Sequence, residues 1–463
     1  MKFKLKQFEI DKDDPFGPSD ILNRKAQGEA LANLIQNVEP PFVIALNSPW
    51  GTGKTTFVHQ MKQYLENQDH CHPCVYFNAW ETDYHSDPII AFTSEIIDVL
   101  SENGNSGAEQ KKNIEKLKET AGKISQRLLP LLLKFLTRGA IDLDKEIEDF
   151  LADGAAAAAS ELVDAYKGEK DLLEEFKRTL GAAIDNLETN CKRLPLVIFV
   201  DELDRCRPTY AIELLERIKH IFDVDNVVFL CSIEKQQLMV SLSSVYGSGT
   251  NSNGYLKRFF DLEITLQRPN RSQFTGALVQ KFGLANFFKN RKVDLELEEF
   301  FESAGLLFSI FDADLRAQEH CMSAVAVAAL MTPENQYLFP RMLLVLITLK
   351  VFVPDLYHKY AFGDASGKAT WEALKEKYPI ISNLNEDDKI PIQAELIIAK
   401  MARSAIQSED NQYYTELVGN PREEVERTRL GEYLALFSRG YPTRRPQLSY
   451  IVNKIELSDI SDY

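Results

Sequence analysis

The sequence predicts an α/β fold in which a parallel sheet is flanked by helices, with a large helical insertion and a helical C-terminal region. Five short apolar runs alternate with segments of helical periodicity, and this alternation favours a parallel sheet covered on both faces. Polar turns follow the first and third runs, at the strand ends where ligands bind in open α/β sheets. The fold class therefore also indicates where a functional site would lie.

The predicted elements follow one another in a regular order. Helical periodicity that opens at Asp20 ends at Pro40-Pro41, because proline cannot continue a helix. A further helix is expected to begin near Lys54, and residues 89–190 indicate one acidic helix after another. The strands are expected at residues 42–46, 75–80, 196–200, 227–231 and 262–266.

The length of the chain is sufficient for two or three domains. It has 463 residues, of which 44% are hydrophobic. We expect an N-terminal lead and helix over residues 1–38, a sheet domain over 39–270 that contains the insertion at about 89–190, and a helical domain over 271–463.

The charge and cysteine content restrict the class of protein. The formal net charge is -16, which is poorly matched to coating nucleic acid, although a local basic site remains open. Six cysteines are too few for a disulfide scaffold and indicate a reducing compartment. No signal-peptide pattern follows the basic start. We therefore expect a cytoplasmic protein.

The strongest membrane candidate is the leucine-rich stretch at residues 128–136. It is far shorter than the roughly 20 residues that span a bilayer, and Lys134 interrupts it. A buried or amphipathic helix is favoured, while peripheral membrane contact stays open. We expect no transmembrane segment.

The turn after the first strand has the pattern of a phosphate-binding loop. Gly53, Lys54 and Thr55 match the end of G-x-x-x-x-G-K-[ST], and Ser48 stands where the first glycine belongs. The amides of the loop and of the following helix would hold phosphate, Lys54 would reach the terminal phosphates, and Thr55 would help hold Mg2+. The residues expected to bind the nucleotide are Ser48, Pro49, Trp50, Gly51, Thr52, Gly53, Lys54, Thr55 and Thr56. The alternative is a glycine-rich turn without a ligand.

Two adjacent carboxylates follow the third apolar run. Asp201 is placed to hold Mg2+, and Glu202 is placed to act as general base on the attacking water. A solvated start of a loop is the alternative, and the upstream phosphate loop disfavours it. After the next strand, Ser232 is expected either to sense the γ-phosphate or to cap a helix. Together the two motifs predict hydrolysis of ATP with Mg2+.

These motifs resemble the KAP family of P-loop NTPases. The resemblance rests on four segments, at residues 48–55, 76–80, 201–206 and 255–259, and covers roughly residues 15–345. The tryptophan at Trp50, the Asn-Ala-Trp end of the second strand and the Leu-Asp-Arg after Glu202 are its most specific features. The segment 314–319 is similar to the Leu-Arg motif of the family's helical region.

The resemblance implies a bacterial or phage-type ATPase, with a role in phage exclusion or antiviral defence. It also implies a switch, in which ATP controls homo-oligomer formation or binding to a protein partner. The sequence departs from the family pattern at Ser48 and at Glu202, where a second aspartate is common. Its insertion is too polar for the membrane helices that many members carry there.

Several arginines could complete the site. Arg316, or else Arg258, Arg205 or Arg341 of this or a neighbouring subunit, would offset charge in the transition state, although an ordinary salt bridge is an equal alternative for each. Arg24 is expected to pack beside the adenine.

Two other functions remain open at the sequence level. One is a scaffold that binds ATP and hardly turns it over, which the intact Lys54, Asp201 and Glu202 disfavour. The other is a nucleic-acid-dependent motor, which the acidic balance disfavours. Residues 439–446 combine basic and aromatic side chains. A loop between two helices is favoured, and the alternative is a site that binds an acidic partner or a nucleic-acid strand.

Overall fold

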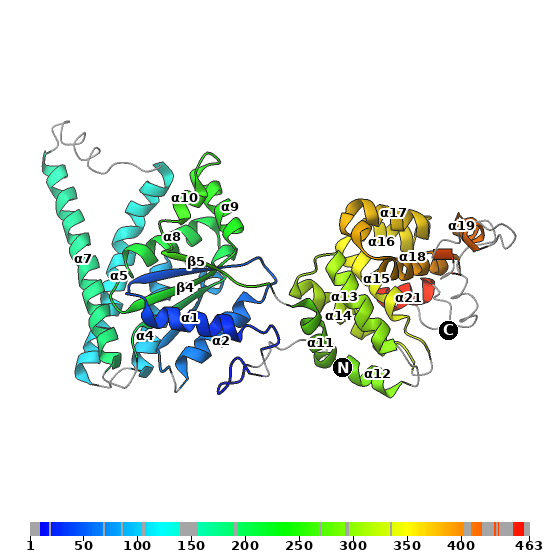
Figure 1. Ribbon diagram of the computed structural model, residues 1–463. Helices are drawn as coiled ribbons and strands as arrows, with labels where there is room; N and C mark the ends of the chain where they lie inside the picture. The colour runs from blue at the N-terminus through cyan, green and yellow to red at the C-terminus, as the bar shows by residue number, and fades with distance from the viewer. Residues whose placement is uncertain are drawn as a thin grey trace. The chain divides into compact units, whose positions relative to one another are not determined.

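The computed structural model describes residues 10–17, 20–67, 70–84, 87–103, 107–138, 156–188, 193–268, 270–291, 296–333, 336–401, 409–418, 430–431, 434 and 448–457. The chain forms two compact units (Figure 1), one from Phe8 to Arg268 and the other from Pro269 onward. Residues 439–446 lie outside the described residues.

A five-stranded parallel sheet forms the centre of the first unit. The strands are paired in the order β2-β3-β4-β1-β5, and every pairing is parallel. Strands form at all five predicted runs, but the second ends at Asn78. Ala79 and Trp80, which the prediction included in it, begin a short helix because the Asn78 side chain caps it. Their bounds are β1 (Phe42–Asn47), β2 (Cys74–Asn78), β3 (Leu196–Asp201), β4 (Val227–Ile233) and β5 (Leu262–Thr265).

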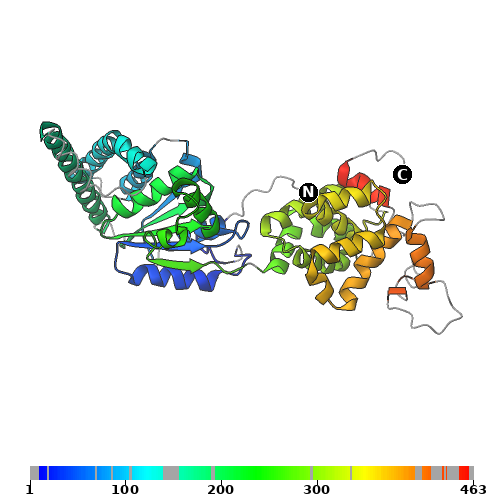
Figure 2. The same ribbon diagram turned by 90° about the horizontal axis from the view of Figure 1, so that it is seen from above.

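Helices cover both faces of this sheet, which confirms the predicted fold class. Successive strand residues point to opposite faces, so Val43 and Ala45 pack into one hydrophobic cluster and Ile44 and Leu46 into another. This explains why the strands are continuous apolar runs rather than alternating ones. Leu31 of α1 (Lys25–Asn37) and Phe57 of α2 (Lys54–Glu66) pack with Ile44 in the second cluster, and Figure 2 shows α1 along this face.

The opposite face carries the remaining helices of the first unit. Three of them, α8 (Pro208–His220), α9 (Lys235–Tyr246) and α10 (Ser252–Leu256), connect β3, β4 and β5 in turn. Two short elements, α3 (Ala79–Thr82) and the 3-10 turn η1 (Leu203–Arg205), directly follow β2 and β3. These elements place side chains at the carboxyl ends of the strands.

The predicted helical insertion is present between β2 and β3. It consists of α4 (Pro88–Asn103), α5 (Ala108–Arg138) and α7 (Ala156–Glu188), and α5 and α7 run side by side (Figure 1). Gln110 of α5 joins them, because its amide donates to the Ala183 carbonyl at 3.2 Å and accepts from Asn186 at 3.0 Å. Leu117 and Ile124 pack in the same cluster as Phe176.

A search of the described residues finds no helix with both the length and the apolar character needed to cross a bilayer. The candidate stretch at residues 128–136 belongs to α5, but its side chains lie outside the described part of the structure.

The second unit is helical throughout its described residues, as predicted. Its central helix is α15, whose residues from Met342 to Leu349 are all buried, as expected for a helix that is apolar on every side. Its elements are α11 (Arg271–Lys281), α12 (Leu284–Asn290), α13 (Glu296–Ile310), α14 (Leu315–Leu330), α15 (Pro340–Phe352), α16 (Pro354–Ala361), α17 (Gly367–Lys377), η2 (Pro379–Asn383), α18 (Glu386–Met401), α19 (Glu409–Val418) and α21 (Leu448–Glu456).

The packing of α17 on α18 depends on a glycine. A Cβ atom added to Gly367 would lie 2.4 Å from the Leu396 carbonyl oxygen, closer than a carbon can approach, whereas one added to Gly276 of α11 meets nothing within 4 Å. We predict that Gly367→Ala destabilises the unit by about 2 kcal/mol through overpacking. Gly276→Ala should stabilise it by about 0.5–1 kcal/mol, because alanine loses less backbone entropy. Calorimetry of the full chain would measure both, and equal unfolding temperatures for the two variants would contradict the close approach.

Candidate functional site

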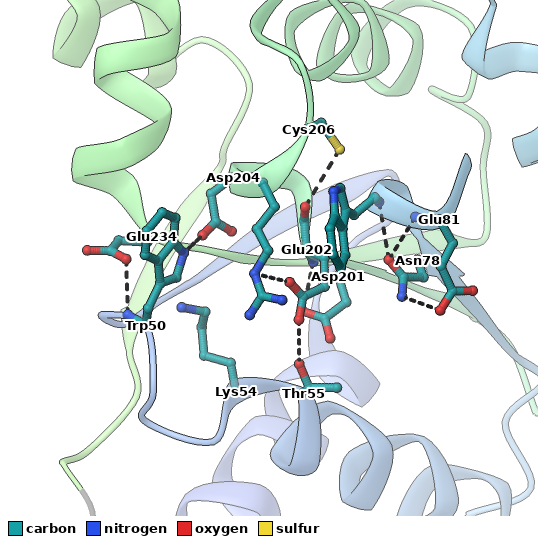
Figure 3. Close-up of polar contacts among 12 residues, drawn as sticks. Trp50, Lys54, Thr55, Asn78, Glu81, Asp201, Glu202, Asp204, Cys206 and Glu234 are labelled. Atoms are coloured by element: carbon teal, nitrogen blue, oxygen red, sulfur yellow. Dashed lines mark hydrogen bonds and ion pairs between the residues drawn. The ribbon is translucent and has the colours of Figure 1, made fainter. Parts of the chain in front are cut away.

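The candidate site lies at the carboxyl ends of β1, β3 and β4. Since β4 pairs with both β1 and β3 in parallel, the segments that follow these strands meet at one edge of the sheet. Figure 3 shows Lys54 and Thr55, at the start of α2, facing Asp201, Glu202 and Asp204. The structure therefore brings together the two segments that the sequence singled out, which lie about 150 residues apart in the chain.

The backbone of the loop after β1 depends on two glycines. Gly51 and Gly53 have φ angles of 71° and 82°, in the left-handed region that glycine adopts without a steric cost. Gly53 directly precedes Lys54, the first residue of α2. This turn directs the free amides at the start of the helix into the loop, and such amides favour an anion.

Ser48 has a structural reason to replace the first glycine of the pattern. Its hydroxyl donates to the Thr52 hydroxyl at 2.8 Å, and Thr52 in turn donates to the Pro49 carbonyl at 2.8 Å. Both side chains are buried, and the Ser48 amide donates to the carbonyl of Ile233 in β4 at 3.1 Å. The serine thus closes the loop from inside and ties it to the neighbouring strand.

Lys54 is 9% exposed and surrounded by acidic groups. Its Nζ donates to the carbonyls of Ser48 at 2.5 Å and Pro49 at 3.2 Å. Burial lowers the pKa of Lys54, while the charges of Asp204, Glu234, Asp201 and Glu202 act in the opposite direction. Four carboxylates around one ammonium leave an excess of negative charge that a divalent cation would offset.

Asp201 is the last residue of β3 and is 1% exposed. One of its carboxylate oxygens accepts from the Glu202 amide at 2.9 Å, and the other accepts from the Tyr76 hydroxyl at 3.4 Å. Tyr76 lies on β2, the adjacent strand, and was not expected from the sequence to contact this carboxylate. Its hydroxyl orients the group predicted to hold the metal.

Glu202 occupies an unusual backbone conformation. Its φ and ψ angles are 62° and 22°, a left-handed region that costs a non-glycine residue about 1–2 kcal/mol. The turn directs its carboxylate toward α2, where it accepts from the Thr55 hydroxyl at 3.2 Å. Burial, assisted by the charge of Asp201, raises the pKa of Glu202, and Arg205 opposes this shift.

The oxygen donors at this edge fit Mg2+. Thr55 and Asp201 supply a hydroxyl and a carboxylate, which are hard ligands, and Mg2+ is held by one or two such side chains together with phosphate oxygens. In the described part of the chain no group of three or more His, Cys, Asp or Glu side chains forms a dedicated metal cage. The donor set is therefore suited to a metal that arrives with a phosphate ligand.

Trp50 connects the phosphate loop to the segments that follow β3 and β4. Its indole Nε1 donates to the Asp204 carboxylate, and its amide donates to Glu234 at 3.0 Å (Figure 3). Glu234 lies just before α9, after β4. Trp50 and Asp204 both belong to sequence motifs, but no spacing rule indicated that their side chains would meet.

Arg24 lies beneath the loop and is 2% exposed. Its guanidinium donates to the carbonyls of Thr52 at 2.6 Å and Gly53 at 3.2 Å, and to Gln267 at 3.2 Å. Burial lowers the pKa of Arg24 to about 10, so it stays protonated at neutral pH. The structure gives Arg24 a supporting contact with the loop backbone, and its predicted contact with adenine stays a prediction.

The other predicted residues occupy varied positions. Ser232 is fully buried within β4, and α9 is capped at Glu234, so Ser232 is not the cap of that helix. Its predicted role as a γ-phosphate sensor stays open. Pro49 lies between Ser48 and Trp50 in the loop, and the Thr56 side chain is half-buried at the start of α2.

The candidate arginines also differ in their surroundings. Arg205 forms an ion pair with Glu202, and Arg258 is exposed beside the Tyr255 ring. Arg341 pairs with Glu395 at 3.2 Å and Glu299 at 3.6 Å, which is a salt bridge within the second unit. Arg316 is exposed near the start of α14 in the same unit.

Comparison with known proteins adds independent evidence. The family model described as "KAP family P-loop domain" matches residues 24–332, more than half of the chain. The chain belongs to the KAP family of P-loop NTPases. This confirms the resemblance seen in the motifs. As a member of the KAP family, the chain carries a nucleotide-binding P-loop domain.

Solved structures extend the comparison to more distant proteins. The KAP-family chain is similar to the Aeropyrum pernix ORC2 protein, in an ADP form and in ADPNP-ADP complexes. Both match at 14% identity, over 94% of this chain and 94% of that chain, with a TM-score of 0.33. At this score the likeness carries no conclusion about ligands or function. A comparison with curated proteins gave no match.

Removing the buried guanidinium beneath the loop should weaken the fold and the site together. We predict that Arg24→Ala lowers the free energy of unfolding by about 2–3 kcal/mol, because buried carbonyls lose a charged donor. Nucleotide affinity should fall as well, since two of those carbonyls belong to the loop. Urea denaturation and calorimetric titration with ATP would measure the two effects. Lys25→Ala, at an exposed neighbour, serves as the control, and equal affinity in both variants would contradict the supporting role.

Proposed function

We propose that this KAP-family protein binds ATP with Mg2+ at the loop of residues 48–56 and hydrolyses it. The observation that carries the proposal is the contact of Thr55 with Glu202 at 3.2 Å, directly beside the buried Asp201. This contact places the candidate base next to the hydroxyl expected to hold the metal. A phosphate held by the adjacent loop would lie within reach of both.

Each side chain has a distinct role in this proposal. Lys54 and the amides at the start of α2 hold the phosphates, and Thr55 and Asp201 hold the metal. Mg2+, when bound, neutralises phosphate charge and orients the terminal phosphate. Glu202 orients a water and accepts its proton, a role that the raised pKa of this carboxyl favours. A kinase is less well supported, because the Asp-Glu pair suits activation of water.

In the same proposal, binding and hydrolysis of ATP switch the protein between two assembly states. ATP would control the assembly of this protein with further copies or with a protein partner, in antiviral defence or phage exclusion in the cytoplasm. The support for this setting is the family resemblance. An arginine, with Arg316 as first candidate, would offset charge on the transferring phosphate.

Two alternatives follow from the same loop. A nucleotide-locked scaffold would bind ATP with little turnover, and the presence of Lys54, Asp201 and Glu202 at one edge argues against it. A nucleic-acid-dependent motor would need a basic surface, and the net charge of -16 argues against that.

Replacing the candidate base should separate binding from hydrolysis. We predict that Glu202→Gln lowers the single-turnover rate about 100-fold or more, because the amide cannot accept the proton from water. ATP affinity should persist, since the loop is intact. Quench-flow kinetics and calorimetric titration would measure the two quantities. Glu29→Gln, at an exposed position on α1, is the control, and a wild-type rate in Glu202→Gln would exclude Glu202 as the base.

The switch predicts that mass in solution depends on the nucleotide. We expect light scattering of Glu202→Gln to show a larger mass with ATP and Mg2+ than without them, because this variant should retain bound ATP. Lys54→Ala should show no change, since it loses its hold on the phosphates. If the mass of Glu202→Gln is the same with and without ATP and Mg2+, ATP-controlled assembly of this protein with further copies is excluded.

A further inference from the structure

Glu202 is held from two sides. Thr55 donates to one carboxylate oxygen, and the Nε of Arg205 lies 2.5 Å from the other. Arg205 is only three residues further along the chain, at the end of η1, and its side chain is 26% exposed. The ion pair therefore links Glu202 to the turn that begins with it.

The turn at Glu202 fixes its backbone but not its side chain, so the contact with Arg205 can orient the carboxylate. Glu202 has left-handed backbone angles, and its carbonyl accepts from the Arg205 amide at 3.1 Å. The backbone fixes where the side chain starts, but a glutamate retains several rotatable bonds. The Thr55 hydroxyl on one side of the carboxylate and the charged guanidinium of Arg205 on the other restrict that freedom. The carboxylate can then face a water bound beside the terminal phosphate.

Arg205 is itself held by an aromatic ring. Its guanidinium carbon lies 5.7 Å from the centre of the Trp80 ring, within the range of a cation–π contact. Trp80 is 54% exposed, so packing into the core does not explain it. Its amide is bound by the Asn78 side chain at 3.1 Å, and Asn78 pairs with Asp201 across β2 and β3.

These contacts form a chain from the second strand to the candidate base. Asn78, at the end of β2, accepts a hydrogen bond from the Trp80 amide. The Trp80 ring contacts the Arg205 guanidinium, and Arg205 forms an ion pair with Glu202. Arg207, the neighbouring arginine, has a different carboxylate partner and a more exposed side chain. Arg207 is paired with Asp83 at 2.5 Å and is 57% exposed, whereas Arg205 is 26% exposed.

We propose that Arg205 is a positioning residue for Glu202, and that the Trp80 ring holds Arg205 in place for this role. The inference rests on the proposed hydrolysis of ATP, with Glu202 as base. It assigns Arg205 a role different from direct contact with the transferring phosphate. The two roles make different predictions when Arg205 and Glu202 are replaced together.

A double-mutant cycle separates them. Arg205→Gln should lower the single-turnover rate at saturating ATP by about 10-fold or more, as expected when a catalytic group loses its alignment. The dissociation constant for ATP should change less than about twofold, because uniform binding is unaffected. Arg205→Lys should recover part of the rate, since it keeps the charge but not the planar fork. In the Glu202→Gln background, Arg205→Gln should have no further effect.

Two further variants complete the experiment. Trp80→Ala should lower the rate in the same direction as Arg205→Gln but by less, and Trp80→Phe should retain more of the rate. Arg207→Gln removes the same charge two residues away and should hydrolyse ATP like the wild type. A further loss of rate when Arg205→Gln is added to Glu202→Gln would overturn the proposal and favour direct action on the phosphate. Equal losses of rate in Arg207→Gln and Arg205→Gln would also overturn the proposal, because the loss would then follow from the change in net charge.

A wild-type protein without any turnover would instead refute the proposed hydrolysis. In that case the link between the two side chains is tested by thermal unfolding of the same four proteins. Shifts in unfolding temperature that are fully additive for Glu202→Gln and Arg205→Gln would overturn the inference, because residues in contact are expected to couple.

Discussion

The parallel pairing of β4 with both β1 and β3 is the constraint on which the site depends. This pairing sets Asn47, the last residue of β1, beside Ile233, and Val200, which precedes the last residue of β3, beside Cys231. Both strands therefore end at the same edge, although the insertion separates them in the chain. The contact of Thr55 with Glu202 depends on this register together with the left-handed turn at Glu202. A shift of one residue would turn each side chain to the other face.

Negative charge is the second property that organises the site. Burial lowers the pKa of Lys54, and the charges of Asp204, Glu234, Asp201 and Glu202 offset only part of that shift. Part of this charge is used within the protein, since Asp204 and Glu234 both accept from Trp50 and Glu202 pairs with Arg205. Asp201 accepts from neutral donors, the Tyr76 hydroxyl and the Glu202 amide. Its negative charge is therefore the one best placed to bind a cation together with phosphate.

Contacts with Arg24, within the loop and through Trp50 stabilise the phosphate loop. Beneath it, Arg24 binds the carbonyls of Thr52 and Gly53, while the hydroxyls of Ser48 and Thr52 close it from inside. Trp50, within the loop, donates to Asp204 after β3 and to Glu234 after β4. A phosphate loop with glycine at the first position lacks the inner hydroxyl contact. Ser48 therefore restricts the backbone more than glycine would, and its hydroxyl fixes the shape of the loop. A fixed shape favours anion binding because the loop amides need not be ordered when the anion binds.

The fold class, all five strands, the helical insertion and the positions of Lys54, Thr55, Asp201 and Glu202 could be predicted from the sequence. Strand periodicity, glycine punctuation and motif spacing are local properties, so residues close in the chain suffice to express them. The remaining contacts join residues that are distant in the chain or depend on backbone angles. Arg24 reaching Gln267, Tyr76 reaching Asp201, and Trp80 lying against Arg205 have no signature in spacing. They exist because sheet register and the left-handed turn at Glu202 bring these side chains within reach of one another, and that geometry arises when the strands pair.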